Sequence, residues 1–188
     1  TKTDILTPIR PDMERLNEVV RTTLHSEVPL VNQVAEYLIS AGGKRLRPAI
    51  HLLLTRALQT ECPDTAYTLA AVVEFIHTST LLHDDVVDES DLRRGRQTAN
   101  ALFGNAASVL VGDFLYSRSF QMMVSVQNMR VMDILADATN VIAEGEVLQL
   151  LNVHDPDVTE ARYMQVIHYK TARLFDASAQ LSAVMSAC

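Results

Sequence analysis

Apolar residues recur every three to four positions along most of this chain, which is the spacing that builds one face of an α-helix. Between about residues 11 and 40 the pattern runs through Met13, Leu16, Val20 and Val34. It is interrupted near Pro29, because proline disrupts the helical hydrogen-bond series. The pattern therefore predicts two helices joined by a bend.

Further helices are predicted downstream. They cover about residues 48–58, 65–88, 105–126, 130–151 and 159 to near the C-terminus. The breaks between them fall at glycines or polar loops, at residues 42–43, 61–64 and 154–157 among others. The sequence contains no internal repeat or interdomain linker. These patterns predict an all-α fold with one core.

The composition agrees with this prediction and limits the classes of molecule that the protein is expected to bind. Of the 188 residues, 48% are hydrophobic, with few glycines, prolines or aromatic residues, which suits one helical domain. The net charge of -7 argues against general binding to nucleic acid or anionic lipid. No apolar run reaches transmembrane length, and residues 1–4 do not open a signal peptide. Cys62 and Cys188 form no CxxC motif, which fits a reducing compartment, so we expect the cytoplasm.

An acidic cluster ends the long helix predicted at residues 65–88, where the sequence reads DDVVD. Asp84 and Asp88 lie one turn apart on one face if the helix continues, with Asp85 beside them. Like charges at this spacing, at the negative end of a helix dipole, destabilise the helix unless water or a cation neutralises them. Carboxylate oxygens suit Mg²⁺, whereas Zn²⁺ would require more His or Cys ligands.

The acidic cluster continues a polar stripe along the same helix. The stripe consists of His77, Thr80, Asp84, Asp88 and, if the helix persists, Asp91. A solvated surface face is the alternative interpretation. Apolar residues flank the stripe on both sides, which favours a stripe that faces a cavity: Phe75, Ile76, Leu81, Leu82, Val86 and Val87.

Two basic clusters flank the acidic one. GGKRLRP at residues 42–48 is expected around a helix N-terminus, where backbone amides also favour anions, and RRG occupies residues 93–95. Either cluster alone is more often a solvated turn. Because arginine can bind phosphate through two parallel hydrogen bonds, the three motifs together predict a site for magnesium and a phosphorylated substrate.

These motifs, with NAASVLVGDFLYSRSF at residues 105–120, AEGEVLQL at 143–150 and YKTARLF at 169–175, resemble the trans-polyprenyl diphosphate synthase family. The resemblance covers nearly the whole chain and is strongest to the N-terminal part of long-chain members. It implies an isoprenoid-synthase-type helical bundle around a central cavity. Isopentenyl diphosphate would be added repeatedly to an allylic diphosphate such as farnesyl diphosphate, by ionisation, condensation and proton loss. The long all-trans product would serve a quinone side chain.

The resemblance also implies roles at the allylic diphosphate. Asp84 and Asp88 would bind Mg²⁺, and Asp85 would help to hold it. Three further side chains would contact the allylic diphosphate itself: Arg93, Lys170 and Thr171.

A second group of residues would bind isopentenyl diphosphate according to the same resemblance. Lys44, Arg47 and His77 would hold its diphosphate, with Arg45 nearby and Arg94 contributing from the second basic cluster. The upstream cluster also argues against a terpene cyclase, since that class of enzyme binds a single diphosphate substrate.

Product length is partly predicted by the resemblance. In the family, aromatic side chains four and five residues before the first aspartate form a floor, and here these residues are the small Thr80 and Ser79. A long product is therefore expected, limited by deeper residues such as Met122, Met123 or Leu135. Methionine at helical spacing is also common in an ordinary core.

The family's second aspartate-rich motif is missing from the sequence. Residues 154–157 have the wrong spacing to replace it. We therefore expect residues 1–188 to be the N-terminal part of a single synthase domain. The alternative is a non-catalytic subunit or fragment that binds prenyl diphosphates.

The family is typically homodimeric, through helices that include residues 105–126. A homodimer is expected on this basis. An apolar helix such as residues 106–115 could equally be buried inside one subunit.

Overall fold

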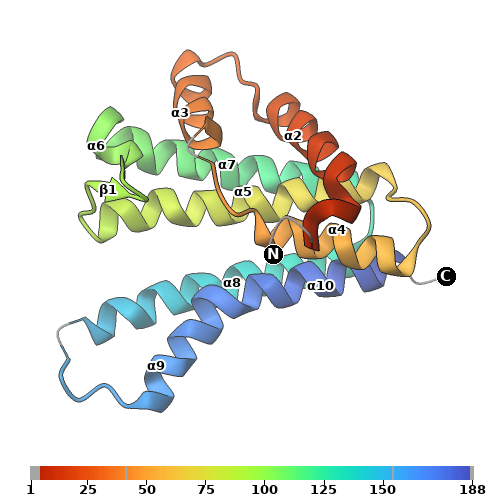
Figure 1. Ribbon diagram of the computed structural model, residues 1–188. Coiled ribbons are helices and arrows are strands. Elements are labelled where there is room, and N and C mark those ends of the chain that lie inside the picture. Colours follow the sequence, from red (N-terminus) through yellow and green to blue (C-terminus); the bar gives the residue numbers. More distant parts are fainter. Residues whose placement is uncertain (1–4, 41, 154, 187–188) are drawn as a thin grey trace.

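The computed structural model describes residues 5–40, 42–153 and 155–186 (Figure 1). In these ranges the regular secondary structure is helical apart from one short hairpin, so the predicted all-α class is confirmed. His154, Cys188 and residues 1–4, which entered the sequence predictions, lie outside the described residues. Within the described ranges, no helix combines the length and the apolar character that a membrane span requires.

The N-terminal helices form one side of the bundle. A short 3₁₀ turn, η1 (Thr7–Ile9), which was not predicted, leads into α2 (Arg10–Leu24), and α3 (Pro29–Ser40) follows after the predicted bend. Leu16, Val20 and Leu24 recur every four residues on the buried face of α2.

A buried charge also holds α2 in place. Asp12, which is 1% exposed, accepts two hydrogen bonds from Arg56 (3.0 and 2.9 Å) and one from Tyr67 (2.7 Å). Arg56 belongs to α4 (Leu46–Leu58) and Tyr67 to α5 (Asp64–Val87). This network therefore ties α2 to two later helices.

The central pair of helices is α5 and α7 (Asn105–Ser125), which lie side by side in Figure 1. Residues 69–73 of α5 are fully buried, so this helix forms the middle of the core. Serine hydroxyls link the two backbones: Ser79 donates to the Gly112 carbonyl (2.8 Å) and Ser108 donates to the Leu82 carbonyl (3.0 Å). These contacts fix the end of α5, where the acidic cluster lies.

The opposite side of the bundle contains α8 (Met129–Asn152), α9 (Glu160–Ile167) and α10 (Arg173–Ser186). Figure 1 shows α10 alongside both α8 and α4. A π-helical segment, η2 (His168–Ala172), joins α9 to α10 and packs against α8 at Gly145. A Cβ at Gly145 would lie 2.7 Å from the Cβ of Tyr169, so glycine permits this close approach.

Three details differ from the predicted elements. The helix α5 ends at Val87, and Glu89 has a left-handed φ of 51°, so Asp91 does not continue the polar stripe. A hairpin of β1 (Leu92–Arg93) and β2 (Arg96–Gln97) and the short α6 (Ala99–Phe103) fill the segment that follows. The last predicted helix is interrupted by η2. Strands of two residues and a π-helical segment of one turn are too short to produce a recognisable periodicity of apolar residues in the sequence.

Candidate functional site

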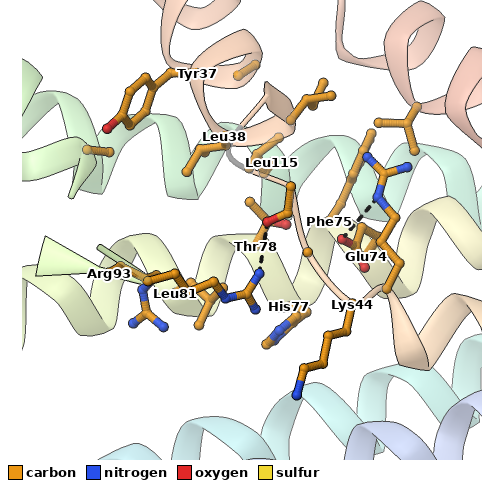
Figure 2. Close-up of a pocket in the computed structure, with 18 of the residues that line it drawn as sticks. Tyr37, Leu38, Lys44, Glu74, Phe75, His77, Thr78, Leu81, Arg93 and Leu115 are labelled. Atoms are coloured by element: carbon orange, nitrogen blue, oxygen red, sulfur yellow. Dashed lines mark hydrogen bonds and ion pairs between the residues drawn. The ribbon is translucent and has the colours of Figure 1, made fainter. Parts of the chain in front are cut away.

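A cavity of about 220 Å³ lies between the loop at residues 42–45 with the start of α4, the middle of α5 and the hairpin (Figure 2). Its apolar side comes from α2, α3 and α7, including Leu38 and Leu115. Its polar side contains several of the residues predicted to bind isopentenyl diphosphate: Lys44, Arg45, Arg47, His77 and Arg94. The structure thus brings the two basic clusters together although about one long helix separates them in the sequence.

The loop at residues 42–45 is held by α5 and by the hairpin. Arg45 adopts a left-handed conformation (φ 45°), hydrogen-bonds with Asn17, and lies with its Nε 3.9 Å from the Glu74 carboxylate. Arg94 donates from Nη1 to the Gly42 carbonyl (2.8 Å). Burial raises the pKa of Glu74, and the positive charges of the surrounding arginines offset part of this rise. The loop is therefore attached to α5 through one arginine and to the hairpin through the other.

His77 and Arg47 lie deeper in the cavity wall. Burial is the main cause that lowers the pKa of His77 to about 4, and the nearby arginines add to it, so the imidazole is neutral at neutral pH. Burial also lowers the pKa of Arg47, whose guanidinium carbon lies 4.4 Å from the centre of the Phe175 ring. Lys44 is exposed at the edge of the cavity.

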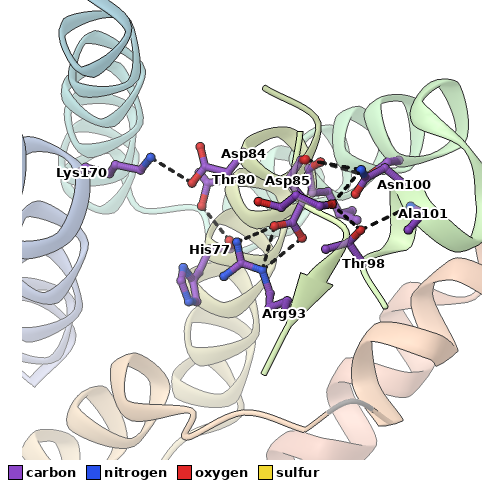
Figure 3. Close-up of polar contacts among 12 residues, drawn as sticks. His77, Thr80, Asp84, Asp85, Arg93, Thr98, Asn100, Ala101 and Lys170 are labelled. Carbon is purple, nitrogen blue, oxygen red and sulfur yellow. Dashed lines mark hydrogen bonds and ion pairs between the residues drawn. The ribbon is translucent and has the colours of Figure 1, made fainter. Parts of the chain in front are cut away.

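Asp84 lies seven residues after His77 on the same face of α5 and points toward α8 and η2 (Figure 3). Its carboxylate lies 3.0 Å from the Lys170 ammonium, which also contacts Glu146 (2.8 Å) and Gln149 (2.8 Å). Burial and the neighbouring Asp84 raise the pKa of Glu146 to about 7. Burial alone would lower the pKa of Lys170, but its hydrogen bonds to Glu146 and Asp84 leave that pKa above its ordinary value. Side-chain oxygens of Asp84, Glu146 and Gln149 thus surround the Lys170 ammonium.

Asp85 points away from Asp84, to the hairpin side (Figure 3). It is 5% exposed and accepts a bidentate interaction from Arg93, with Nη2 at 2.7 Å and Nε at 3.0 Å. This contact raises the pKa of Arg93. Arg93 was predicted to contact the allylic diphosphate and Asp85 to help hold the metal. In the structure these two residues bind each other.

The remaining predicted residues lie in varied surroundings. Asp88 is exposed at the C-cap of α5, where its amide donates to the Asp84 carbonyl (2.7 Å), and Thr171 is exposed on η2. Ser79 is buried against α7, and the half-buried Thr80 donates to the His77 carbonyl (2.7 Å). The residues proposed to limit product length are all part of the buried core: Met122, Met123 and Leu135.

Four site residues were not singled out from the sequence. Glu146 and Gln149 lie within the AEGEVLQL motif and Phe175 within YKTARLF, while Glu74 precedes His77 by one helical turn. The spacing of Glu146 and Gln149 places both on one helical face, which could have indicated a shared target. An aromatic residue at helical spacing carries no such signal, because it resembles ordinary core.

The acidic residues suit a magnesium ion by their chemistry. Asp84 already lies against a cation, and both Asp84 and Asp88 offer the carboxylate oxygens that hard divalent cations prefer. In the described ranges, no three His, Cys, Asp or Glu side chains are arranged to enclose a metal ion. Magnesium commonly takes one or two carboxylates and completes its coordination with phosphate and water. The donor set therefore fits Mg²⁺ bound together with a phosphorylated ligand.

The fold and the site define a class of α-helical proteins in which an aspartate-rich helix end lies between two groups of cationic side chains. The chain belongs to the polyprenyl synthetase family, whose profile matches residues 28–188. The family resemblance stated from the sequence motifs is thereby confirmed.

Curated relatives include long-chain enzymes. The chain is 58% identical over 177 residues to the octaprenyl diphosphate synthase of Escherichia coli K12, an overlap of 94% of this chain and 54% of that protein. It is 46% identical over 185 residues to an all-trans-nonaprenyl-diphosphate synthase of Rhodobacter capsulatus, covering 98% of this chain and 57% of that protein. The chain thus spans little more than half the length of these relatives.

Solved structures agree with the family and the fold. A decaprenyl diphosphate synthase from Rhodobacter capsulatus superposes with a TM-score of 0.92 at 48% identity, over 99% of this chain and 57% of that chain. A polyprenyl synthase from Caulobacter crescentus, complexed with calcium and isoprenyl diphosphate, gives 0.93 at 46% identity, over 99% of this chain and 56% of that chain. The isoprenoid-synthase-type helical fold is therefore confirmed for this chain.

Proposed function

We propose that the chain is the N-terminal part of a single synthase domain, and that the whole protein is a magnesium-dependent trans-polyprenyl diphosphate synthase. It would add isopentenyl diphosphate repeatedly to an allylic diphosphate such as farnesyl diphosphate. The observation that carries this proposal is the pair of sites along α5 at which cationic side chains gather. Lys170 lies at Asp84 near the end of the helix, and Arg47, His77 and Arg94 line the cavity beside its earlier turns.

The allylic substrate fits the Lys170 side. Asp84 and Asp88 would hold the metal ions, and Lys170 and Thr171 would contact the diphosphate from η2. Bound magnesium would stabilise the negative charge that develops on the departing diphosphate. Lys170 lies 3.0 Å from the Asp84 carboxylate, and this proximity supports a role in which its ammonium would add to this stabilisation.

Isopentenyl diphosphate fits the cavity side. The loop at residues 42–45, the start of α4 and the hairpin supply cations from Lys44, Arg47 and Arg94, while His77 is neutral and can donate one hydrogen bond and accept another. Two diphosphates would thus bind beside different turns of α5. Their carbon chains would meet near the end of this helix, where the allylic C–O bond breaks, the new C–C bond forms and a proton is lost. The apolar walls of the bundle would exclude water from this step.

The physiological setting rests on the relatives. The long-chain relatives support a long product, and the small Ser79 and Thr80 leave no aromatic floor next to the acidic cluster. We propose that this product serves a quinone side chain and that the protein acts in the cytoplasm, where the free thiol of Cys62 would remain reduced. We also propose a homodimer through α7, on which Val109 and Leu110 are exposed.

Mass spectrometry of the lipid products tests the proposed reaction. Incubation of the protein with farnesyl diphosphate, isopentenyl diphosphate and Mg²⁺ should give a ladder of polyprenyl diphosphates. Asp84→Asn should reduce elongation by at least about 100-fold, because the metal would lose a charged ligand. Asp157→Asn, an exposed loop aspartate, is the matched control and should elongate normally.

Other products would identify the other classes of protein. Hydrocarbon products would indicate a cyclase. Binding of both diphosphates without elongation would indicate a non-catalytic subunit and would contradict the proposed reaction.

A further inference from the structure

Most cations predicted to bind phosphate already have a partner in the structure. Those with partners are paired as follows: Arg45 with Asn17 and Glu74, Arg93 with Asp85, Lys170 with Asp84, and Arg94 with the Gly42 carbonyl. Arg47 differs from them. It lines the cavity, it forms no ion pair with any of the described residues, and its buried Nε has no hydrogen-bond partner.

The guanidinium group of Arg47 packs against an aromatic ring. Its guanidinium carbon lies 4.4 Å from the ring centre of Phe175, which is within the range of a cation–π interaction. Arg47 lies in the first turn of α4 and Phe175 in the first turn of α10. Glu74 attracts Arg47 electrostatically, but its carboxylate lies 3.9 Å from Arg45. The ring therefore fixes the guanidinium without occupying its N–H donors.

We propose that Phe175 is a positioning residue that holds Arg47 with its N–H donors free for the diphosphate of isopentenyl diphosphate. The inference rests on the proposed function and adds to it a residue that acts on only one of the two substrates. A carboxylate in place of the ring would neutralise Arg47 and compete with the diphosphate. A flat apolar partner avoids both effects, because the face of the ring attracts the cation but accepts none of its directed hydrogen bonds.

Because Arg47 is partly buried, the position of its guanidinium depends on the Phe175 ring. The pKa of Arg47 is lowered by burial, so its charge is incompletely compensated in the free protein. A bound diphosphate would supply the missing counter-charge and the missing acceptor for Nε. Without the ring, the side chain could leave this position for solvent, and each binding event would have to order it again.

Binding calorimetry with two ligands tests the inference. Phe175→Leu keeps an apolar side chain but removes the ring face, so the Kd for isopentenyl diphosphate should rise roughly 3- to 30-fold. The Kd for farnesyl thiolodiphosphate, an unreactive allylic analogue, should stay within about 2-fold. Phe175→Tyr retains the ring face and should bind isopentenyl diphosphate like the natural protein.

The matched control is Phe114→Leu. The guanidinium carbon of Arg118 lies 4.8 Å from the ring centre of Phe114, which does not line the cavity, so loss of this ring should change neither Kd. Equal weakening of both ligands by Phe175→Leu, or no weakening of isopentenyl diphosphate, would overturn the inference.

A double-mutant cycle separates positioning from simple packing. Arg47→Met should weaken isopentenyl diphosphate binding, and Phe175→Leu added to Arg47→Met should weaken it no further, because the ring would act through Arg47. Full additivity of the two changes would show that Phe175 acts independently, and the inference would be wrong. If the natural protein itself fails to bind isopentenyl diphosphate, the proposed function fails, which is a separate outcome.

Discussion

At the scale of single residues, two aspartates that are neighbours in the sequence bind different cations. Asp84 lies 3.0 Å from Lys170, whereas Asp85 binds Arg93 on the other side of α5. Consecutive helical residues are about 100° apart, so the divergence itself follows from the helix. The identity of the partners does not, because Lys170 and Arg93 arrive from segments whose placement depends on tertiary packing.

Asp85→Asn tests the buried pair. The change removes the charge that Arg93 requires and should lower the free energy of unfolding by about 2 kcal/mol. Urea denaturation measures this loss. Arg15→Ala breaks the exposed pair with Glu18 and should cost less than about 0.5 kcal/mol. Equal losses in the two variants would mean that the Asp85 pair contributes no more than a surface pair.

At the scale of elements, the sequence predicted the long helices well because each has a boundary signal. The predicted helix at 65–88 is observed as Asp64–Val87, since Pro63 precedes it and no proline or glycine interrupts it. The hairpin depends instead on contacts outside the strands. Thr98 donates to the Ser90 carbonyl (2.7 Å), and Asn100 donates to the same carbonyl (3.1 Å). A local pattern cannot predict such contacts.

The interface of α4 and α10 contains a buried polar cluster. His51 is 1% exposed, and its Nδ1 lies 2.8 Å from the Ser182 hydroxyl. Burial lowers the pKa of His51 to about 4. The interface therefore favours the neutral form of the His51 imidazole.

This interface predicts a pH dependence of stability. The folded pKa of His51 lies below the ordinary value of 6.5, so the unfolded chain binds more protons between these values. The contribution is fully present above about pH 6.5 and falls as the pH drops toward 4. Between pH 7 and pH 5 the loss should be about 2 kcal/mol.

Urea denaturation at both pH values, compared with His51→Gln, isolates this contribution. His77 has a similarly lowered pKa and titrates in both proteins, so it cancels in the comparison. The same loss of stability in both proteins would contradict the assignment to His51.

At the scale of the whole molecule, the chain is acidic but concentrates cations where diphosphates are proposed to bind. The net charge is -7, whereas the cavity is lined by Lys44, Arg45, Arg47, Arg93, Arg94 and Arg96. The motif order predicted this gathering. The ring of Phe175 was not predicted, because only the packing of α10 on α4 brings it to Arg47.

Ligand-linked stability tests the proposed allylic site at Asp84 and Lys170. Farnesyl thiolodiphosphate with Mg²⁺, at about 100 times its Kd, should stabilise the protein by about 2.7 kcal/mol and raise Tm by roughly 5–10 °C. Differential scanning fluorimetry measures the shift. Farnesol, which lacks the diphosphate, is the control, and an equal shift with farnesol would mean that the carbon chain alone accounts for binding.

The buried Asp12 has a consequence for the order of assembly. Its partners Arg56 and Tyr67 lie 44 and 55 residues away along the chain. The carboxylate can leave water at acceptable free energy only when both partners are in place. We therefore expect α2 to dock late, after α4 and α5 have already met.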